Sequence, residues 1–268
     1  LDLQDRIIKI MESAYQSKLE KEKKAQEILN SIDGYLTEKL GLVPSYVNTG
    51  LSFALRRKDI QEKLNAESYL RKGSMKANFK CVPLGKILNN EFERGQPREI
   101  DGKVAYVGLP ECSQTEIETI ALREPKEVAG RKTAMQGDIL FARIEPSVFN
   151  KKYVFVRNLK EYDSVYLSTE FHVLRADKKQ CDQEYLYFLL FSDFIFSQVA
   201  GRTAGSTGRR RLDEGALMSV QLPLPRMELQ REIAAEVRKR RKQAAVLKQQ
   251  AITCMEQAKK EVGSILLS

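Results

Sequence analysis

The chain has 268 residues, of which 42% are hydrophobic and 30% are charged, and it carries a formal net charge of +9 at pH 7. No hydrophobic run is long enough to cross a membrane and no signal peptide is visible, which argues against a membrane protein and a secreted protein and favours the cytoplasm. The excess of positive charge predicts an acidic partner, and nucleic acid is the usual counterpart of such a protein.

Residues 1–41 are predicted to form one long helix, because Gly41 and Pro44 are residue types that commonly end helices. The opening sequence returns 226 positions later, where Asp2-Leu3-Gln4-Asp5-Arg6-Ile7 is matched by Glu228-Leu229-Gln230-Arg231-Glu232-Ile233. The hydrophobic positions of the two segments then stay in step. Such a repeat indicates two copies of one long helix that bracket a single domain.

Hydrophobic positions in the second copy alternate with spacings of four and three, which is the seam of a coiled coil about 40 residues long. Only Arg240 and Glu261 interrupt this seam, whose members are Ile233, Val237, Arg240, Ala244, Leu247, Ala251, Cys254, Ala258, Glu261 and Ile265. The first helix must run toward the domain and the second away from it, so we expect the two to pair antiparallel. Each would be roughly 60 Å long at 1.5 Å per residue.

Turn residues follow the first helix, and residues 56–70 have the amphipathic pattern of a short helix that stops near Gly73. From Phe79 onwards, period-two alternation and short apolar runs predict strands. They are expected at 81–84, 104–107, 138–144, 153–156 and 168–174, with a further strand at 220–224. A helix at 183–198 is rich in Tyr, Phe and Leu, so we expect it to be buried on most sides.

These elements predict an α+β protein with a mixed α/β, strand-rich domain flanked by two long helices in an antiparallel coiled coil. The expected segments are a helix at 1–42, a linker with a short helix at 43–78, the strand-rich domain at 79–225 and a second helix at 226–268.

Positive charge is concentrated near the second helix, where residues 200–242 contain 11 Arg or Lys and five acids. This basic segment begins with an arginine loop, Arg202-Thr203-Ala204-Gly205-Ser206-Thr207-Gly208-Arg209-Arg210-Arg211. Glycines allow close approach to a phosphate, hydroxyls and amides donate hydrogen bonds, and guanidiniums bind phosphate or guanine. We expect at least one of the three final arginines to anchor phosphate. The alternative is that they pair with acids such as Asp213 and Glu214 and only fasten the loop.

A second group of candidate residues follows the strand at 138–144. Arg143, Ser147, Lys151 and Lys152 lie at or beyond the expected end of that strand, where loop side chains can reach DNA. The alternative is that this segment is only a buried strand between two turns. His172 lies in an alternating strand and is interpreted as structural, whereas Tyr106 and Gln114 are weaker candidates for contacts with bases. The complete set of expected DNA-binding residues is Arg143, Ser147, Lys151, Lys152, Arg202, Gly205, Ser206, Thr207, Arg209, Arg210 and Arg211.

Signatures of catalysis are missing from the sequence. A DNA amino-methyltransferase would need an Asn/Asp-Pro-Pro-aromatic motif and a glycine-rich cofactor loop, and a restriction nuclease would need carboxylates clustered around a divalent metal. Neither pattern occurs. The single histidine leaves no Ser/His/Asp or Cys/His set, and the four cysteines form no CxxC pair, which argues against a zinc site or a disulfide framework. We expect no cofactor, no metal and no catalytic residue.

Four segments in order resemble the DNA specificity subunit of type I restriction-modification systems. They are Gly-Asp-Ile-Leu-Phe-Ala-Arg-Ile-x-Pro-Ser at 137–147, Ser-Thr-Glu-Phe-His-Val-Leu-Arg at 168–175, Gly-Ser-Thr-Gly-Arg-Arg-Arg-Leu at 205–212, and Leu-Pro-Leu-Pro-x-x-Glu-Leu-Gln-Arg-Glu-Ile at 222–233. The resemblance implies that the strand-rich domain is a target recognition domain that reads one half of a split double-stranded DNA site. It also implies that the long helices are spacers that dock methyltransferase subunits, which methylate adenine.

That family has two recognition domains and two conserved helices, whereas this sequence has one recognition domain. It is therefore expected to be the C-terminal half of such a subunit, or a half-subunit that dimerises through its helices. Two other functions stay open at this point. The chain could be the C-terminal specificity region of a fused type II restriction and modification enzyme. It could also be a coiled-coil scaffold or an RNA binder, since Gly205-Ser206-Thr207-Gly208 resembles the GxxG clamp of KH domains.

Overall fold

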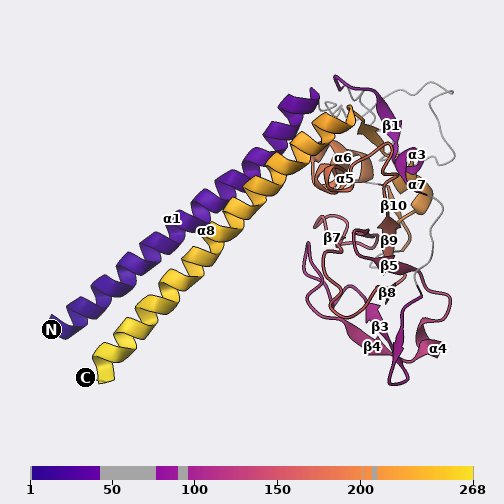
Figure 1. The fold of residues 1–268 in the computed structure, drawn as a ribbon. Coiled ribbons are helices and arrows are strands. Elements are labelled where there is room, and N and C mark those ends of the chain that lie inside the picture. Colours follow the sequence, from indigo (N-terminus) through magenta and orange to yellow (C-terminus); the bar gives the residue numbers. More distant parts are fainter. Residues whose placement is uncertain (1, 43–76, 90–95, 201, 207–209, 268) are drawn as a thin grey trace. The chain divides into compact units, whose positions relative to one another are not determined.

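The computed structural model describes residues 2–42, 77–89, 96–200, 202–206 and 210–267. The chain divides into two compact units, a helical unit made of Leu1–Glu38 and Glu232–Ser268 and a second unit made of Lys39–Arg231. Figure 1 shows both units, with the long helices in indigo and yellow. The expected short helix at 56–70 and the linker before it lie outside the described residues.

Two long antiparallel helices make up the helical unit, α1 (Asp2–Leu40) and α8 (Met227–Leu267). Ser31 and Arg240 contact one another, as do Ala14 and Cys254, so position numbers fall along one helix as they rise along the other. Buried positions in α8 include Ile233 and then Val237, Ala244, Ala251 and Ala258, which are seven residues apart, and buried positions in α1 include Ala14, Ala25 and Leu36, which are eleven residues apart. The predicted antiparallel coiled coil is confirmed.

Alanine fills most of this seam, so the helices meet through small side chains and their backbones can approach closely. Arg240, which interrupts the hydrophobic pattern, is accommodated by three partners. Its Nη1 donates to the Ser31 Oγ at 2.9 Å, its Nε donates to Glu236 at 2.8 Å, and its guanidinium lies 4.6 Å from the centre of the Tyr35 ring. Glu261, the other interruption, is exposed.

Helix α1 ends at Gly41 as the sequence predicts. Gly41 has a φ of +59°, a left-handed conformation that glycine adopts without strain, and the Asn78 backbone N–H donates to the Leu40 carbonyl at 3.0 Å. A Cβ atom at position 41 would lie 2.2 Å from the Asn78 side chain, so both the conformation and the space at this position require glycine.

Two small sheets form the centre of the second unit. One contains β2 (Glu99–Ile100), β3 (Lys103–Val107), β4 (Ala121–Arg123), β5 (Thr133–Met135) and β8 (Ser164–Leu167). The other has the order β7-β6-β9, with β6 (Ile139–Ala142) between β7 (Tyr153–Phe155) and β9 (Phe171–Leu174). All four residues of β6 are buried. Side chains from both sheets form a common core that includes Val107, Ala134, Leu140, Val154 and Val165.

Strand pairs join segments that are far apart in sequence. The first strand, β1 (Cys81–Pro83), pairs antiparallel with the last, β12 (Gln221–Pro223), which closes the domain on itself. A hairpin-like pair, β10 (Thr203–Ala204) and β11 (Arg211–Leu212), flanks the arginine loop. Short helices complete the unit: α3 (Leu84–Ile87), α4 (Pro125–Val128) and α7 (Glu214–Met218).

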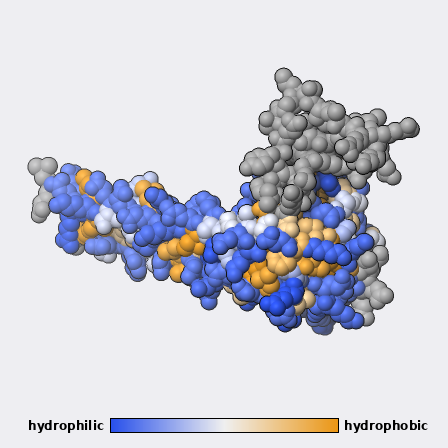
Figure 2. Space-filling view, turned by 90° about the horizontal axis from the view of Figure 1, so that it is seen from above, coloured by the Kyte–Doolittle hydropathy of each residue, from blue (hydrophilic) through white to orange (hydrophobic). Residues whose placement is uncertain are grey.

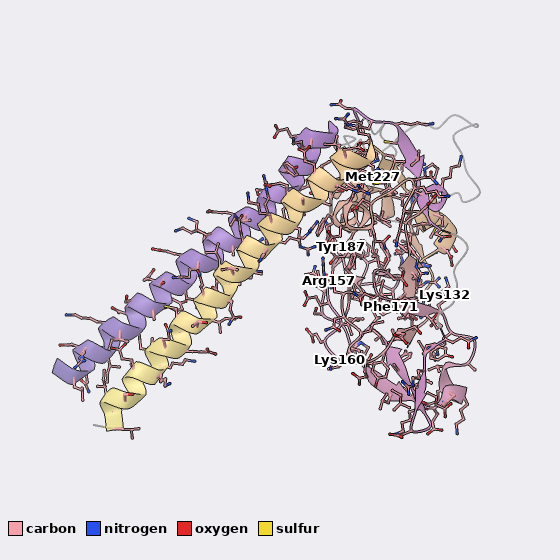
Figure 3. All side chains as sticks on the ribbon, viewed as in Figure 1. Lys132, Arg157, Lys160, Phe171, Tyr187 and Met227 are labelled. Carbon is pink, nitrogen blue, oxygen red and sulfur yellow. The ribbon has the colours of Figure 1, made fainter. Side chains whose placement is uncertain are left out.

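The expected single helix at 183–198 is wrong, because the structure has two helices there, α5 (Gln183–Leu190) and α6 (Asp193–Val199). Ser192 divides them: its hydroxyl accepts a bond from the Ile195 N–H and so starts a new helix. Burial of the aromatic residues is confirmed. Tyr187 and Arg157, labelled in Figure 3, both contact the Phe155 ring of β7, at centre distances of 5.2 and 4.7 Å.

None of the helices in the described part of the chain is long and apolar enough to span a membrane. Figure 2 shows a mainly hydrophilic surface along the helical unit, with hydrophobic side chains in separate patches. The exposed hydrophobic residues of these helices include Leu3, Ile8, Tyr15, Leu19, Val246 and Ile252.

Candidate nucleic-acid interface

The central loop, defined as residues 143–152, leaves the end of the buried strand β6 and is bonded to the arginine loop. The Leu212 N–H donates to the Arg143 carbonyl at 2.7 Å, and the Glu145 N–H donates to the Arg210 carbonyl at 3.0 Å. Ile144 and Arg211 form an isolated antiparallel bridge between these bonds. Two segments that are distant in the sequence therefore form one continuous surface.

The two described arginines at the end of the arginine loop are each paired with an acid. Arg211 forms a bidentate ion pair with Glu170, and Arg210 Nε lies 3.6 Å from a Glu145 carboxylate oxygen. Arg210 also donates to the Thr203 carbonyl at 3.0 Å, and the Thr203 hydroxyl donates to Glu145. The side chains of both arginines are partly exposed, at 36% for Arg210 and 37% for Arg211, although the Arg210 Nε atom is buried.

The acids expected as alternative partners, Asp213 and Glu214, have other roles. Asp213 accepts bonds from the Gly215 and Ala216 N–H groups and so caps α7. Glu214 pairs with Lys132 at 3.2 Å, and Lys132 is labelled in Figure 3. The alternative in which these two acids hold the arginines is wrong for Arg210 and Arg211, which pair with Glu145 and Glu170 instead.

Arg143 lies partly buried at the point where β6 enters the central loop. Its Nε is buried and has no hydrogen-bond partner among the described residues. The nearby His172 is 2% exposed, and its Nε2 donates to the Leu212 carbonyl at 3.1 Å. Burial lowers the pKa of His172, and the positive charges of Arg143 and Lys132 lower it further. This geometry fits a structural role for His172 and leaves Arg143 with donor capacity.

Lys151 and Lys152 are both engaged inside the domain. The Lys151 ammonium donates to the Phe191 carbonyl at 2.7 Å and to Asp193 at 2.9 Å. The Lys152 ammonium donates to the carbonyls of Leu109 and Cys112, at 2.8 and 2.6 Å. These bonds tie the central loop to α6 on one side and to the segment 108–118 on the other, and they favour a scaffold role over direct phosphate contact.

Arg202 is also committed to the protein. Its Nη1 donates to the Ser219 hydroxyl at 2.9 Å and to the Ala216 carbonyl at 3.3 Å, and burial lowers its pKa. Gly205, with a φ of +126°, and Ser206 are exposed at the turn. Ser147 is partly buried and its carbonyl accepts a bond from the Lys152 N–H. Thr207 and Arg209 lie outside the described residues.

A pocket of about 570 Å³ opens between the central loop and the segment 108–118, and part of it was missed by the sequence reasoning. Gln114, a candidate from the sequence, lines it together with Phe149 and Asn150, which were not candidates. The Gln114 side-chain amide donates to the Asn150 carbonyl at 2.7 Å and so joins the two segments. Phe149 and Asn150 could have been found from the sequence, because an aromatic residue stands beside Asn in a loop that follows a buried strand.

Residues 88–251, which are more than half of the chain, match the type I restriction modification DNA specificity domain. The chain belongs to this family. The resemblance stated from the sequence is thereby confirmed, and the surface formed by the arginine loop, the central loop and the segment 108–118 belongs to a DNA specificity domain.

Two solved structures are similar to this specificity domain. One is described as the HsdS subunit from Thermoanaerobacter tengcongensis, and the other as the structural basis of complex assembly and conformational transition of the type I R-M system. Each is 24% identical, has a TM-score of 0.48, and is matched over 60% of this chain and 41% of its own length. The chain thus spans less than half the length of those relatives. A search of curated proteins gives no match.

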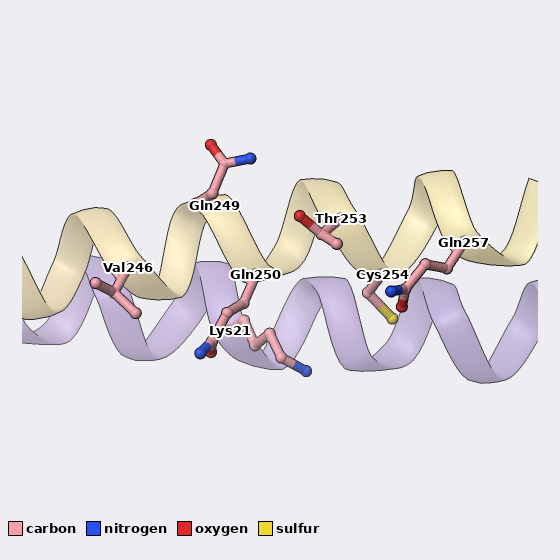
Figure 4. Close-up of a pocket in the computed structure, with 7 residues that line it drawn as sticks. All are labelled: Lys21, Val246, Gln249, Gln250, Thr253, Cys254 and Gln257. Carbon is pink, nitrogen blue, oxygen red and sulfur yellow. The ribbon is translucent and has the colours of Figure 1, made fainter.

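The helical unit carries two shallow grooves. One, of about 450 Å³, is lined by Lys21, Val246, Gln249, Gln250, Thr253, Cys254 and Gln257 and is drawn in Figure 4. The other, of about 690 Å³, has apolar side chains from both helices and a basic rim; its lining residues include Ile28, Ala235, Val246, Leu247, Arg238, Lys239 and Lys242. In the described part of the chain, no group of three or more His, Cys, Asp or Glu side chains could hold a metal.

Proposed function

We propose that the chain recognises double-stranded DNA in a sequence-specific manner and reads one half of a bipartite site for a type I restriction-modification complex. Membership of the DNA specificity domain family carries this proposal. The described part of residues 202–211, 143–152 and 108–118 supports it, because partly exposed arginine side chains and an exposed aromatic residue lie on loops that are bonded to each other.

Phosphate anchoring is assigned to the arginine loop within this proposal. Arg209, Arg210 and Arg211 supply the positive charge, with Gly205, Ser206 and Thr207 providing close approach and hydroxyl donors, and Arg143 contributes from the central loop. Lys151, Lys152, Arg202 and Ser147 belong to the same surface. Because the two lysines and Arg202 donate to internal acceptors, their part is to hold the loops in place for the DNA.

The long helices are proposed to set the distance between half-sites and to dock methyltransferase subunits, which methylate adenine. The basic-rimmed groove supports this assignment, because apolar floors with charged rims suit a partner helix with an acidic border. A second copy of the chain, pairing through these helices, would supply the other half-site reader. The chain itself is proposed to bind no cofactor and to perform no catalysis.

Selection from a pool of random DNA duplexes tests the proposal. The purified chain, alone and with a methyltransferase subunit, is expected to enrich duplexes that share a short motif, and binding should weaken steeply as the salt concentration rises. Equal binding to all duplexes, or preference for RNA of the same length, would overturn the proposal. Titration calorimetry with S-adenosylmethionine should show no binding to the isolated chain, and micromolar binding would contradict the non-catalytic assignment.

A further inference from the structure

Phe149 and Asn150 stand out on the central loop because both side chains are exposed. Phe149 is a large hydrophobic side chain that is 40% exposed, and Asn150 is exposed beside it. The Asn150 side-chain amide makes no hydrogen bond to any described residue, so its oxygen and its N–H groups both remain available. Exposed apolar surface next to an open amide suggests a ligand with a methyl group and paired donor and acceptor atoms.

The backbone under these two side chains is held on three sides. The Asn150 N–H donates to the Pro146 carbonyl at 3.0 Å, and its own carbonyl accepts from the Gln114 amide at 2.7 Å. Lys151, the next residue, is fastened to Phe191 and Asp193. The Phe149 ring also meets Phe196 edge-on, with centres 6.3 Å apart. The contacts therefore fix the backbone of both residues and the Phe149 ring, as readout of a rigid duplex requires.

We infer that Phe149 and Asn150 read an A·T step in the major groove of the target DNA, Asn150 through the adenine edge and Phe149 through a thymine methyl. Asparagine can bond adenine in bidentate fashion, donating to N7 and accepting from the N6 amino group, and a phenyl ring packs against the C5 methyl of thymine. The inference rests on the proposed function and adds to it the bases that this pocket reads.

The pocket is not suited to guanine, because both of the cations that line it are already bonded to the protein. Reading guanine calls for an arginine or lysine that donates to O6 and N7. The two cations that line the pocket, Lys151 and Lys152, each donate to two protein oxygens, at distances between 2.6 and 2.9 Å. An open amide and an exposed ring remain as the reading groups, and they match adenine and thymine.

Modified bases test the inference on the duplex selected by the wild-type chain. Each thymine is replaced in turn by uracil, which lacks only the methyl group, and each adenine by 7-deazaadenine, which lacks only the N7 acceptor. We expect one thymine whose replacement weakens wild-type binding about fourfold, as removal of one buried methyl implies. Within one base pair of this thymine, we expect an adenine whose replacement by 7-deazaadenine weakens binding about fivefold.

The matching variants should remove these sensitivities separately. Phe149→Ala is expected to bind the thymine and uracil duplexes equally, and Asn150→Ala the adenine and 7-deazaadenine duplexes equally. Asn150→Ala should also weaken binding to the selected duplex by roughly 5- to 150-fold while leaving random DNA almost unaffected. Leu122→Ala, which removes another exposed hydrophobic side chain, 46% exposed on β4, is the matched control and should retain both sensitivities.

Three results would overturn the inference while leaving the proposed function intact. They are a selected duplex without a neighbouring pair of sensitive positions, variants that keep the wild-type sensitivities, and variants that weaken all duplexes equally. The first is measured on the wild-type chain alone, so it stands even if a variant folds poorly; Phe149→Leu, which keeps an apolar side chain against Phe196, provides a second variant. A wild-type chain that selects no sequence overturns the proposed function, and the inference with it.

Discussion

Glu170 holds the guanidinium of Arg211 in a bidentate ion pair, with 2.6 Å from Nη2 to Oε1 and 2.9 Å from Nε to Oε2. Hydrogen bonding to Glu170 raises the pKa of Arg211. An acid beside an arginine fixes the direction of the guanidinium and offsets its charge, so the non-specific attraction to phosphate falls while the geometry becomes defined. Glu145 stands in a similar relation to Arg210, at 3.6 Å.

Glu170→Gln should increase binding to random-sequence duplex DNA, because the charge of Arg211 is no longer offset. The slope of log K against log salt is expected to become steeper by up to about 0.9, the contribution of one neutralised phosphate. Fluorescence anisotropy titrations at several salt concentrations measure both effects. Glu228→Gln, which removes an acid at the start of α8, controls for the change in net charge. An unchanged slope would mean that Arg211 only fastens the loop.

Replacing Arg209, Arg210 and Arg211 together by alanine should weaken duplex binding and reduce the salt slope by about 0.9 for each phosphate that is no longer neutralised. A guanine-reading arginine would behave differently, costing about 1–3 kcal/mol on the selected site and much less on random DNA. Comparison of both duplexes therefore separates anchoring from reading. Circular dichroism checks that the fold is intact. Unchanged affinity and slope would move the DNA-facing surface toward Arg143.

The stability of the domain should fall as the solution is acidified, because of His172. Burial lowers the pKa of this imidazole below its ordinary value of 6.5, so the unfolded chain binds the proton more tightly than the folded chain. The contribution of neutral His172 to the free energy of unfolding is complete above pH 6.5 and is lost as the pH falls toward the folded-state pKa. His172→Gln, which keeps an N–H donor for the Leu212 carbonyl, should flatten the pH dependence of the unfolding free energy below pH 6.5. Parallel pH profiles for the two proteins would contradict this.

Ala14→Cys should form a disulfide with Cys254 under mild oxidation, because the Cys254 sulfur lies 3.9 Å from the Ala14 carbonyl in the antiparallel pair. Non-reducing electrophoresis after proteolysis between the helices would show the linked fragments. Ser13→Cys provides the control, since position 13 is adjacent but exposed. Equal crosslinking from both positions would argue against the register of the helical unit.

Asp138→Ala should lower the free energy of unfolding by about 3 kcal/mol, since it removes a buried carboxylate with several donors. Asp138 is 1% exposed, accepts two bonds from Arg175 at 2.6 and 2.7 Å, and accepts one from the Met135 N–H at 2.8 Å. Urea titration measures the decrease. Asp177→Ala, at a half-buried turn position, should cost much less, and an equal cost would contradict the role assigned to the buried pair.

The long helices were predictable because their hydrophobic repeat runs through about 40 residues, far beyond what chance alternation gives. Strands such as β2 and β10 were not, because two residues carry no period. The division of 183–198 was missed since apolar residues continue across Ser192, and one capping hydroxyl is a weak signal within such a run.

The ion pairs of the candidate surface could not be predicted from the sequence for a different reason. The sequence predicts the arginine loop and the central loop as DNA-binding segments, and it offers only the nearest acids along the chain as alternative partners of the arginines. The acids that actually pair, Glu145 and Glu170, come from segments 65 and 41 positions earlier. Which carboxylate reaches a guanidinium depends on how β6, β9 and β11 pair, and this information is not local.

Most bonds that hold the arginine loop, the central loop and the segment 108–118 end on backbone carbonyls rather than on side chains. The carbonyls of Leu109, Cys112 and Asn150 accept the bonds from the central loop and from Gln114, and those of Phe191 and Ala216 accept from Lys151 and Arg202. A carbonyl is present whatever side chain its residue carries. As long as the donor side chains of Gln114, Lys151, Lys152 and Arg202 are kept, the exposed residues of these loops can change while the framework keeps its bonds. Under the proposed function, a few surface substitutions would then change the target sequence.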